Sequence, residues 1–283
     1  MAFGRNSRRN GGIYGMNGMN GGCQGYPIYQ FPTAGIYGLR FWKVMLISIF
    51  GGVAAAAVVF FHPYIVAMVQ EGKISTEAAR LGNVLAADSL ASWLRTVFYL
   101  VSALTAWGLS GYRFPTGEAT ARNVMDADRD GGFEREAVWA WVTTYCLLLS
   151  IGNATCAHYF VPRLMKRLTD TTIVPGIEAS WWLVPAVLVG ALLGLKVFST
   201  ILSSGLSVLF LLISFVAGVL YCLPYFGYSL ASLPIPIPES VTGIETIAVP
   251  MIGPWALMTA LLLHASWTVN SGDRIYVCPT RRP

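Results

Sequence analysis

Residues 44–70 read VMLISIFGGVAAAAVVFFHPYIVAMVQ, a stretch of 27 positions without a charged side chain. A helix rises 1.5 Å per residue, so about 20 apolar residues cross the ~30 Å hydrocarbon core of a bilayer. The stretch is long enough to cross a membrane, and its composition predicts that it does.

The rest of the chain repeats this pattern. Further charge-free runs cover residues 96–112, 137–162, 179–195, 197–238 and 246–272. The whole chain is 55% apolar and only 12% charged, whereas soluble proteins carry roughly 25% charged residues. We therefore expect an all-α integral membrane protein with a bilayer around it and no nucleic-acid partner. Its bundle of about six transmembrane helices is predicted near 44–69, 91–112, 137–161, 181–202, 206–226 and 247–269, within a membrane domain of residues 42–271.

The fourth and fifth spans need a turn between them, because residues 179–238 are interrupted only by Lys196. Ser203, Ser204 and Gly205 are typical turn residues, and a turn there leaves two full-length helices. A turn at Lys196 itself is the alternative.

The two tails are basic. Residues 1–41 are rich in Gly, Asn and Tyr and have no acidic residue, a composition that predicts disorder; residues 272–283 form a short basic C-terminal tail. Lys and Arg are retained on the cytoplasmic side of a membrane. With the amino terminus inside, twelve basic residues lie in inner segments and six in outer loops, Lys196 aside. This predicts both termini on the cytosolic or matrix side, although Arg163, Lys166 and Arg167 lie on the disfavoured side.

All nine tryptophans are found near the margins of the apolar runs. An indole has a large apolar body and one N–H donor, so it favours the headgroup level of a bilayer. We expect these residues to mark the two membrane interfaces.

One segment has the spacing of a cation site. Residues 126–134 read DADRDGGFE and resemble the first nine positions of an EF-hand calcium loop. The resemblance implies a weak calcium site with the ligands Asp126, Asp128, Asp130 and Glu134. The bidentate acid of the twelfth position is missing, because Ala137 stands there. The preferred interpretation is an Asp-rich helix cap, with no cofactor.

Small residues mark two predicted packing seams. Gly190 and Gly194 form a Gly-xxx-Gly pattern, and Gly51 and Gly52 lie on a second small-residue face. In lipid, small residues let helix backbones approach closely and gain dispersion contacts. Neither seam reveals whether its partner is a helix of this chain or of another.

Histidine occurs three times, at His62, His158 and His264, in or at the edge of predicted spans. His62 and His158 approach the same leaflet and offer a pair of metal or haem ligands. No carboxylate in a span would orient them, so we favour neutral histidines hydrogen-bonded between helices.

The sequence has no motif that pairs a nucleophile with a base, and no acidic residue within a predicted span. It therefore argues against an enzyme and against an ion-coupled carrier. We expect a non-enzymatic multi-pass scaffold or accessory subunit of a larger membrane assembly, bound to other membrane subunits or to itself. The alternative is a channel or facilitator for a small solute or ion, modulated by calcium at the acidic loop 126–136. An endomembrane or plasma membrane is favoured. The basic, acid-free tail also fits an organellar transit signal and hence the mitochondrial inner membrane.

Overall fold

The computed structural model describes residues 40–73, 75, 89–110, 133–226, 228 and 244–273. These residues form seven α-helices and one short 3₁₀ helix, with no strand among them. The elements are α2 (Phe41–Gln70), α4 (Leu90–Ser110), α6 (Phe133–Ala154), α7 (Ala157–Thr169), α8 (Ser180–Ile201), α9 (Gly205–Cys222), η2 (Leu223–Phe226) and α10 (Ile244–Asp273). Residues 1–39 of the predicted disordered tail, the acidic loop 126–132 and residues 274–283 lie outside the described residues, whereas Phe41, the last residue of the predicted tail, begins α2.

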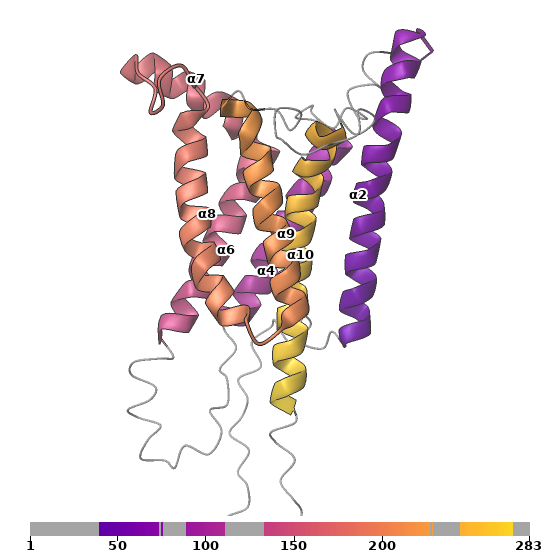
Figure 1. The fold of residues 1–283 in the computed structure, drawn as a ribbon, viewed down its shortest axis with the longest axis vertical. Helices are drawn as coiled ribbons and strands as arrows, with labels where there is room; N and C mark the ends of the chain where they lie inside the picture. Colours follow the sequence, from indigo (N-terminus) through magenta and orange to yellow (C-terminus); the bar gives the residue numbers. More distant parts are fainter. Residues whose placement is uncertain are drawn as a thin grey trace, which may run out of the picture.

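The long helices stand side by side, and successive helices run in opposite directions (Figure 1). Five of the described helices are long and apolar enough to cross a membrane; their spans are Phe41–Gln70, Ala137–Ala154, Ser180–Ile201, Gly205–Phe226 and Ala248–Val269. The protein is therefore a helical integral membrane protein. α4 lies among them and is less apolar, since Arg95, Ser92 and Ser102 fall within it.

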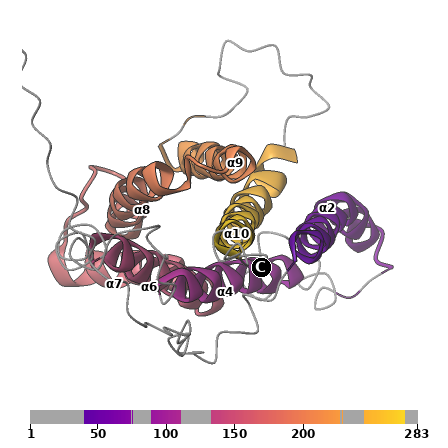
Figure 2. The same ribbon diagram turned by 90° about the horizontal axis from the view of Figure 1, so that it is seen from below.

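The last helix is the centre of the bundle. α10 packs against α2, α4 and α9 (Figure 2), and 72% of its apolar window is buried, against 11–22% for the other four spans. Ala256 and Ala260 on α10 are fully buried, because small side chains allow neighbouring helices to approach.

Two buried clusters share this central helix. One joins α10 to α4, α6, α8 and α9, with Trp139 and Ile201 among its largest members. The other joins α10 to α2 and α4 around Phe98 and Met258. α2 lies at the edge of the bundle in Figure 2 and is attached mainly through the second cluster.

The chain reverses at residues 202–204, between α8 and α9. The turn predicted at Ser203, Ser204 and Gly205 is therefore correct, and Lys196 lies within α8. Ser204 lies in an extended conformation before Gly205, and its hydroxyl is 2.7 Å from that of Ser207.

The third span is shorter than the predicted range 137–161. α6 ends at Ala154, and Cys156 adopts a left-handed conformation with φ of 57°. The apolar run continues past this break into the first half of α7, whereas the second half of α7 carries Arg163, Lys166 and Arg167. Hydropathy alone does not register such a change of direction.

Two tryptophans contact other helices of the bundle. Trp139 is 1% exposed, and Trp255 of α10 donates from Nε1 to the Ser48 carbonyl of α2 at 2.8 Å. α10 runs continuously through Pro250 and Pro254.

Candidate functional site

Arg95 carries a charge into the helical bundle. It lies five residues after the start of α4, and its Nε is buried without a hydrogen-bond partner in the described part of the chain. The ion pairs found there, Lys73 with Glu71 and Lys166 with Glu178, do not include it. An arginine inside a membrane helix marks a functional site when it faces the bundle interior.

Tyr99 lies one turn further along α4 than Arg95, close enough to feel its charge. Tyr145 of α6 and Tyr221 of α9 lie near Tyr99 in turn. The Tyr221 hydroxyl lies 3.3 Å from that of Tyr225. The guanidinium of Arg95 only donates hydrogen bonds, so it is the part of this group that suits an anion, whereas the Tyr145 hydroxyl already donates to the Ala186 carbonyl.

Another polar group joins α4 to α6 at the same end of the bundle. The Asn153 amide nitrogen lies 2.7 Å from both the Ser92 carbonyl and the Thr96 hydroxyl. Ser150 donates to the Thr96 carbonyl at 3.1 Å. The Asn153 side-chain amide thus donates its hydrogen bonds from one helix to another, as polar residues in membrane helices commonly do.

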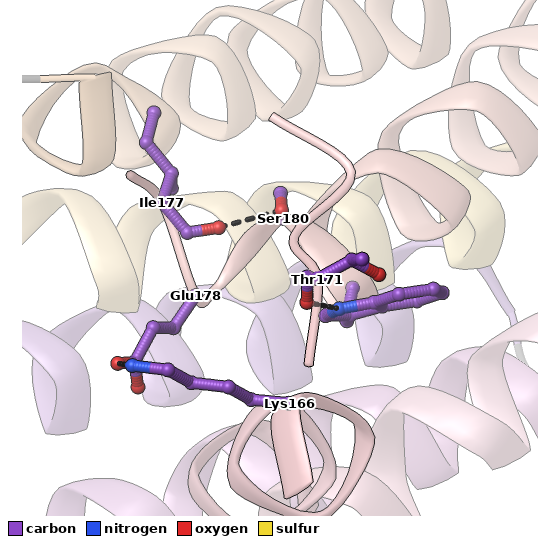
Figure 3. A network of polar contacts seen from close by, with 6 residues as sticks. Lys166, Thr171, Ile177, Glu178 and Ser180 are labelled. Carbon is purple, nitrogen blue, oxygen red and sulfur yellow. Dashed lines mark hydrogen bonds and ion pairs between the residues drawn. The ribbon is translucent and has the colours of Figure 1, made fainter. Parts of the chain in front are cut away.

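The connection between α7 and α8 closes on itself (Figure 3). Ser180 accepts from the Val174 amide at 3.1 Å and donates to the Ile177 carbonyl at 2.6 Å. Trp181 Nε1 donates to the Thr171 carbonyl at 3.0 Å. Gly176 has φ of 80°, a conformation that glycine adopts without strain. The result is a compact turn that holds α7 against the start of α8.

An ion pair strengthens the same connection. Lys166 of α7 donates to a carboxylate oxygen of Glu178, and Figure 3 shows the two side chains reaching toward each other. The hydrogen bond and charge of Lys166 lower the pKa of Glu178, and the same contact raises the pKa of Lys166. Both side chains are exposed, so solvent screens the pair.

The predicted calcium ligands are not assembled in the described residues. Asp126, Asp128 and Asp130 lie outside them, and only the backbone of Glu134 is described, at the start of α6. Within the described part of the chain, no group of three or more His, Cys, Asp or Glu side chains has the arrangement of a metal site. The calcium interpretation stays a prediction.

The predicted glycine seams lie in different surroundings. A Cβ on Gly51 would meet Met258 Cε at 3.2 Å, and one on Gly52 would meet the Trp255 ring at 3.0 Å, so both face α10. A Cβ on Gly190 would lie 2.6 Å from the Tyr145 hydroxyl, which donates to the Ala186 carbonyl at 3.0 Å. At Gly194 an added Cβ would meet no atom within 4 Å.

The histidines are dispersed. His264 stacks between Trp139 and Trp267, with ring centroids 5.6 and 6.3 Å away. His62 is buried in α2. The side chain of His158 is outside the described residues, so its pairing with His62 stays untested.

The group around Arg95 was not singled out from the sequence. The sequence indicates only one part of this group, because Arg95 and Tyr99 are spaced by one helical turn in an otherwise apolar run. The tyrosines of α6 and α9 come near only through the fold. A comparison with family models, with curated proteins and with solved structures gives no match.

Proposed function

We propose that the protein is a multi-pass scaffold or accessory subunit of a membrane assembly, with six spans and both termini on the same side. α4 is taken as the sixth span. Its 21 residues rise about 31 Å, the thickness of the hydrocarbon core.

The observation that supports a scaffold is the outer face of α2. Its buried residues form one stripe against α10, whereas Phe60, Phe61 and Tyr64 are 55–63% exposed. The Phe60 ring meets Phe61 edge to face and lies tilted against Tyr64. Aromatic residues are enriched at protein interfaces. If α2 binds α10 on one side and a second protein on the other, it joins this bundle to that protein.

Co-purification from mild detergent tests this role. We expect stable partners with the native chain and their loss when Phe60, Phe61 and Tyr64 are all changed to Ala. The matched control changes Leu188, Leu192 and Leu195, exposed apolar residues of α8, to Ala. A native chain that elutes without any second protein, or equal partner loss from both variants, contradicts docking through α2.

The second candidate function is a facilitator for a small anion, and the group of Arg95 and its tyrosines favours it. Arg95→Gln should then reduce anion flux into vesicles several-fold, while Arg95→Lys retains more of it because the charge remains. Calcium regulation of this flux is tested in a separate variant, in which Asp126, Asp128 and Asp130 are all changed to Asn. Anion flux that is absent from the native protein contradicts this candidate.

A further inference from the structure

α7 is set apart from the spans by length and direction. It has 13 residues and rises about 20 Å, too short to cross a bilayer. It lies at a steep angle to the long helices, at the end of the bundle where α8 starts (Figure 1). Trp181 and Trp182 begin α8 at this level, and tryptophan favours the headgroup region. α7 is therefore placed at a membrane interface.

One face of α7 is apolar and uncovered. Phe160, Leu164 and Leu168 follow each other at intervals of four residues, so they lie on a single stripe. They are 64%, 40% and 70% exposed. Pro162 is buried, and Val161 and Met165 are half-buried, so the bundle covers a different side of the helix. At this interface, the uncovered stripe lies at the depth where the acyl chains of the lipids begin.

Another face of α7 is basic. Arg163, Lys166 and Arg167 are exposed and spaced by three and four residues. Lys166 is paired with Glu178, whereas neither arginine forms an ion pair within the described residues. Two guanidinium groups thus flank an apolar stripe at headgroup depth. A guanidinium binds phosphate oxygens with two parallel hydrogen bonds.

We propose that α7 lies in the plane of the bilayer interface and binds anionic phospholipids. The stripe of Phe160, Leu164 and Leu168 enters the outer part of the acyl chains, and Arg163 and Arg167 bind headgroup phosphates. An amphipathic helix with basic residues beside an apolar stripe has this orientation. The closed turn and the pair of Lys166 with Glu178 fix its direction relative to α8. The proposal holds whether the protein is a scaffold or a facilitator.

The position of α7 is tested with the full chain in lipid nanodiscs of phosphatidylcholine and phosphatidylglycerol. A nitroxide is placed at Leu168→Cys or at Arg163→Cys in a background whose native cysteines are changed to Ser. We expect the label at 168 to be relaxed by oxygen, which partitions into lipid, and the label at 163 by a water-soluble nickel complex. Relaxation of both labels by nickel alone overturns the interfacial placement.

Lipid selection is tested by measuring the phosphatidylglycerol retained after detergent extraction. Arg163→Gln and Arg167→Gln should each reduce retention about fivefold, the effect of ~1 kcal/mol per basic residue near an anionic surface. Arg→Lys at each position should restore most of the lipid retention. This result would show that the Gln variants lose lipid because the charge is gone and not because they misfold. Lys73→Gln, which removes one exposed charge at the same end, is the matched control. Equal retention by the control and the α7 variants overturns the proposal.

Discussion

Gly190 is the residue whose size matters most directly, because it leaves room for a hydrogen bond. Tyr145 reaches over it from α6 to the Ala186 carbonyl of α8. The absent side chain is therefore part of how α6 and α8 stay together. Gly194, one turn later, has no such neighbour, so the two glycines of one motif are expected to respond differently to the same substitution.

Relative to Gly194→Ala, which gains the same helix propensity, Gly190→Ala is predicted to lower the free energy of unfolding by about 1 kcal/mol, the net contribution of one hydrogen bond. The new methyl group displaces the Tyr145 hydroxyl. Gly194→Ala is the matched control and should be neutral or stabilising by roughly 0.5–1 kcal/mol, because alanine favours a helix. Thermal unfolding in detergent compares them. In the background of Tyr145→Phe, the penalty at Gly190 should shrink, and an unchanged penalty would contradict this explanation.

Between elements, α4 and α6 are joined by polar contacts that the apolar pattern does not reveal. Asn153→Leu is predicted to destabilise the bundle by about 0.6–1.7 kcal/mol, the range of hydrogen bonds measured between membrane helices. The measurement is the midpoint of unfolding by a denaturing detergent. Thr143→Val is the control, since the Thr143 hydroxyl donates to Trp139 within its own helix. A larger effect at Thr143 than at Asn153 would be evidence against the assignment.

The ion pair between α7 and the start of α8 predicts a pH dependence. Lys166 lowers the pKa of Glu178. The ionised Glu178 carboxylate therefore stabilises the folded protein above its unfolded pKa of about 4.3, and this stabilisation is lost as pH falls through the folded pKa. The pKa of Lys166 is raised, so its stabilisation is fully present below the unfolded value of about 10.4 and is lost as pH rises through the folded value.

We therefore expect a nitroxide on α7 to become more mobile in acid, when Glu178 is protonated, and to show no change near neutral pH. The mobility of a label at Thr169→Cys is followed by spectroscopy as pH is lowered below 4.3, the usual Glu value. Glu178→Gln should show the mobile signal throughout and no transition. A transition near neutral pH would point to another group.

The sequence predicts the helical membrane class and the turn between α8 and α9, because both depend on local composition. Long charge-free runs need lipid, and Ser203, Ser204 and Gly205 favour a turn. It does not predict the end of α6 at Ala154, since the left-handed conformation of Cys156 is a backbone choice that hydropathy does not encode. The sequence also does not predict the surroundings of Arg95, because Tyr145 and Tyr221, which lie near Tyr99, belong to other helices.

For the whole molecule, the count of crossings decides where the ends lie. The five apolar spans alone would place the termini on opposite sides, whereas α4 as a sixth places them together. We predict that labels at Ser7→Cys and Ser240→Cys react from opposite sides of the membrane, because the tail and the loop after α9 are separated by five crossings. Reagents that do not cross membranes make the measurement in a cysteine-free background. Reaction of both positions from one side would contradict six spans.

The contact of Trp255 with Ser48 has a consequence for biosynthesis. These residues are 207 positions apart in the chain, so α2 leaves the ribosome long before its partner α10 has been made. Until then, Gly51 has Phe98 of α4 beside it but not Met258, and Gly52 lacks the Trp255 ring. Both buried clusters include α10, so both are completed in one late step. A chain that stalls before α10 would lack a helix that both clusters contain, although α4 and α6 could already pair.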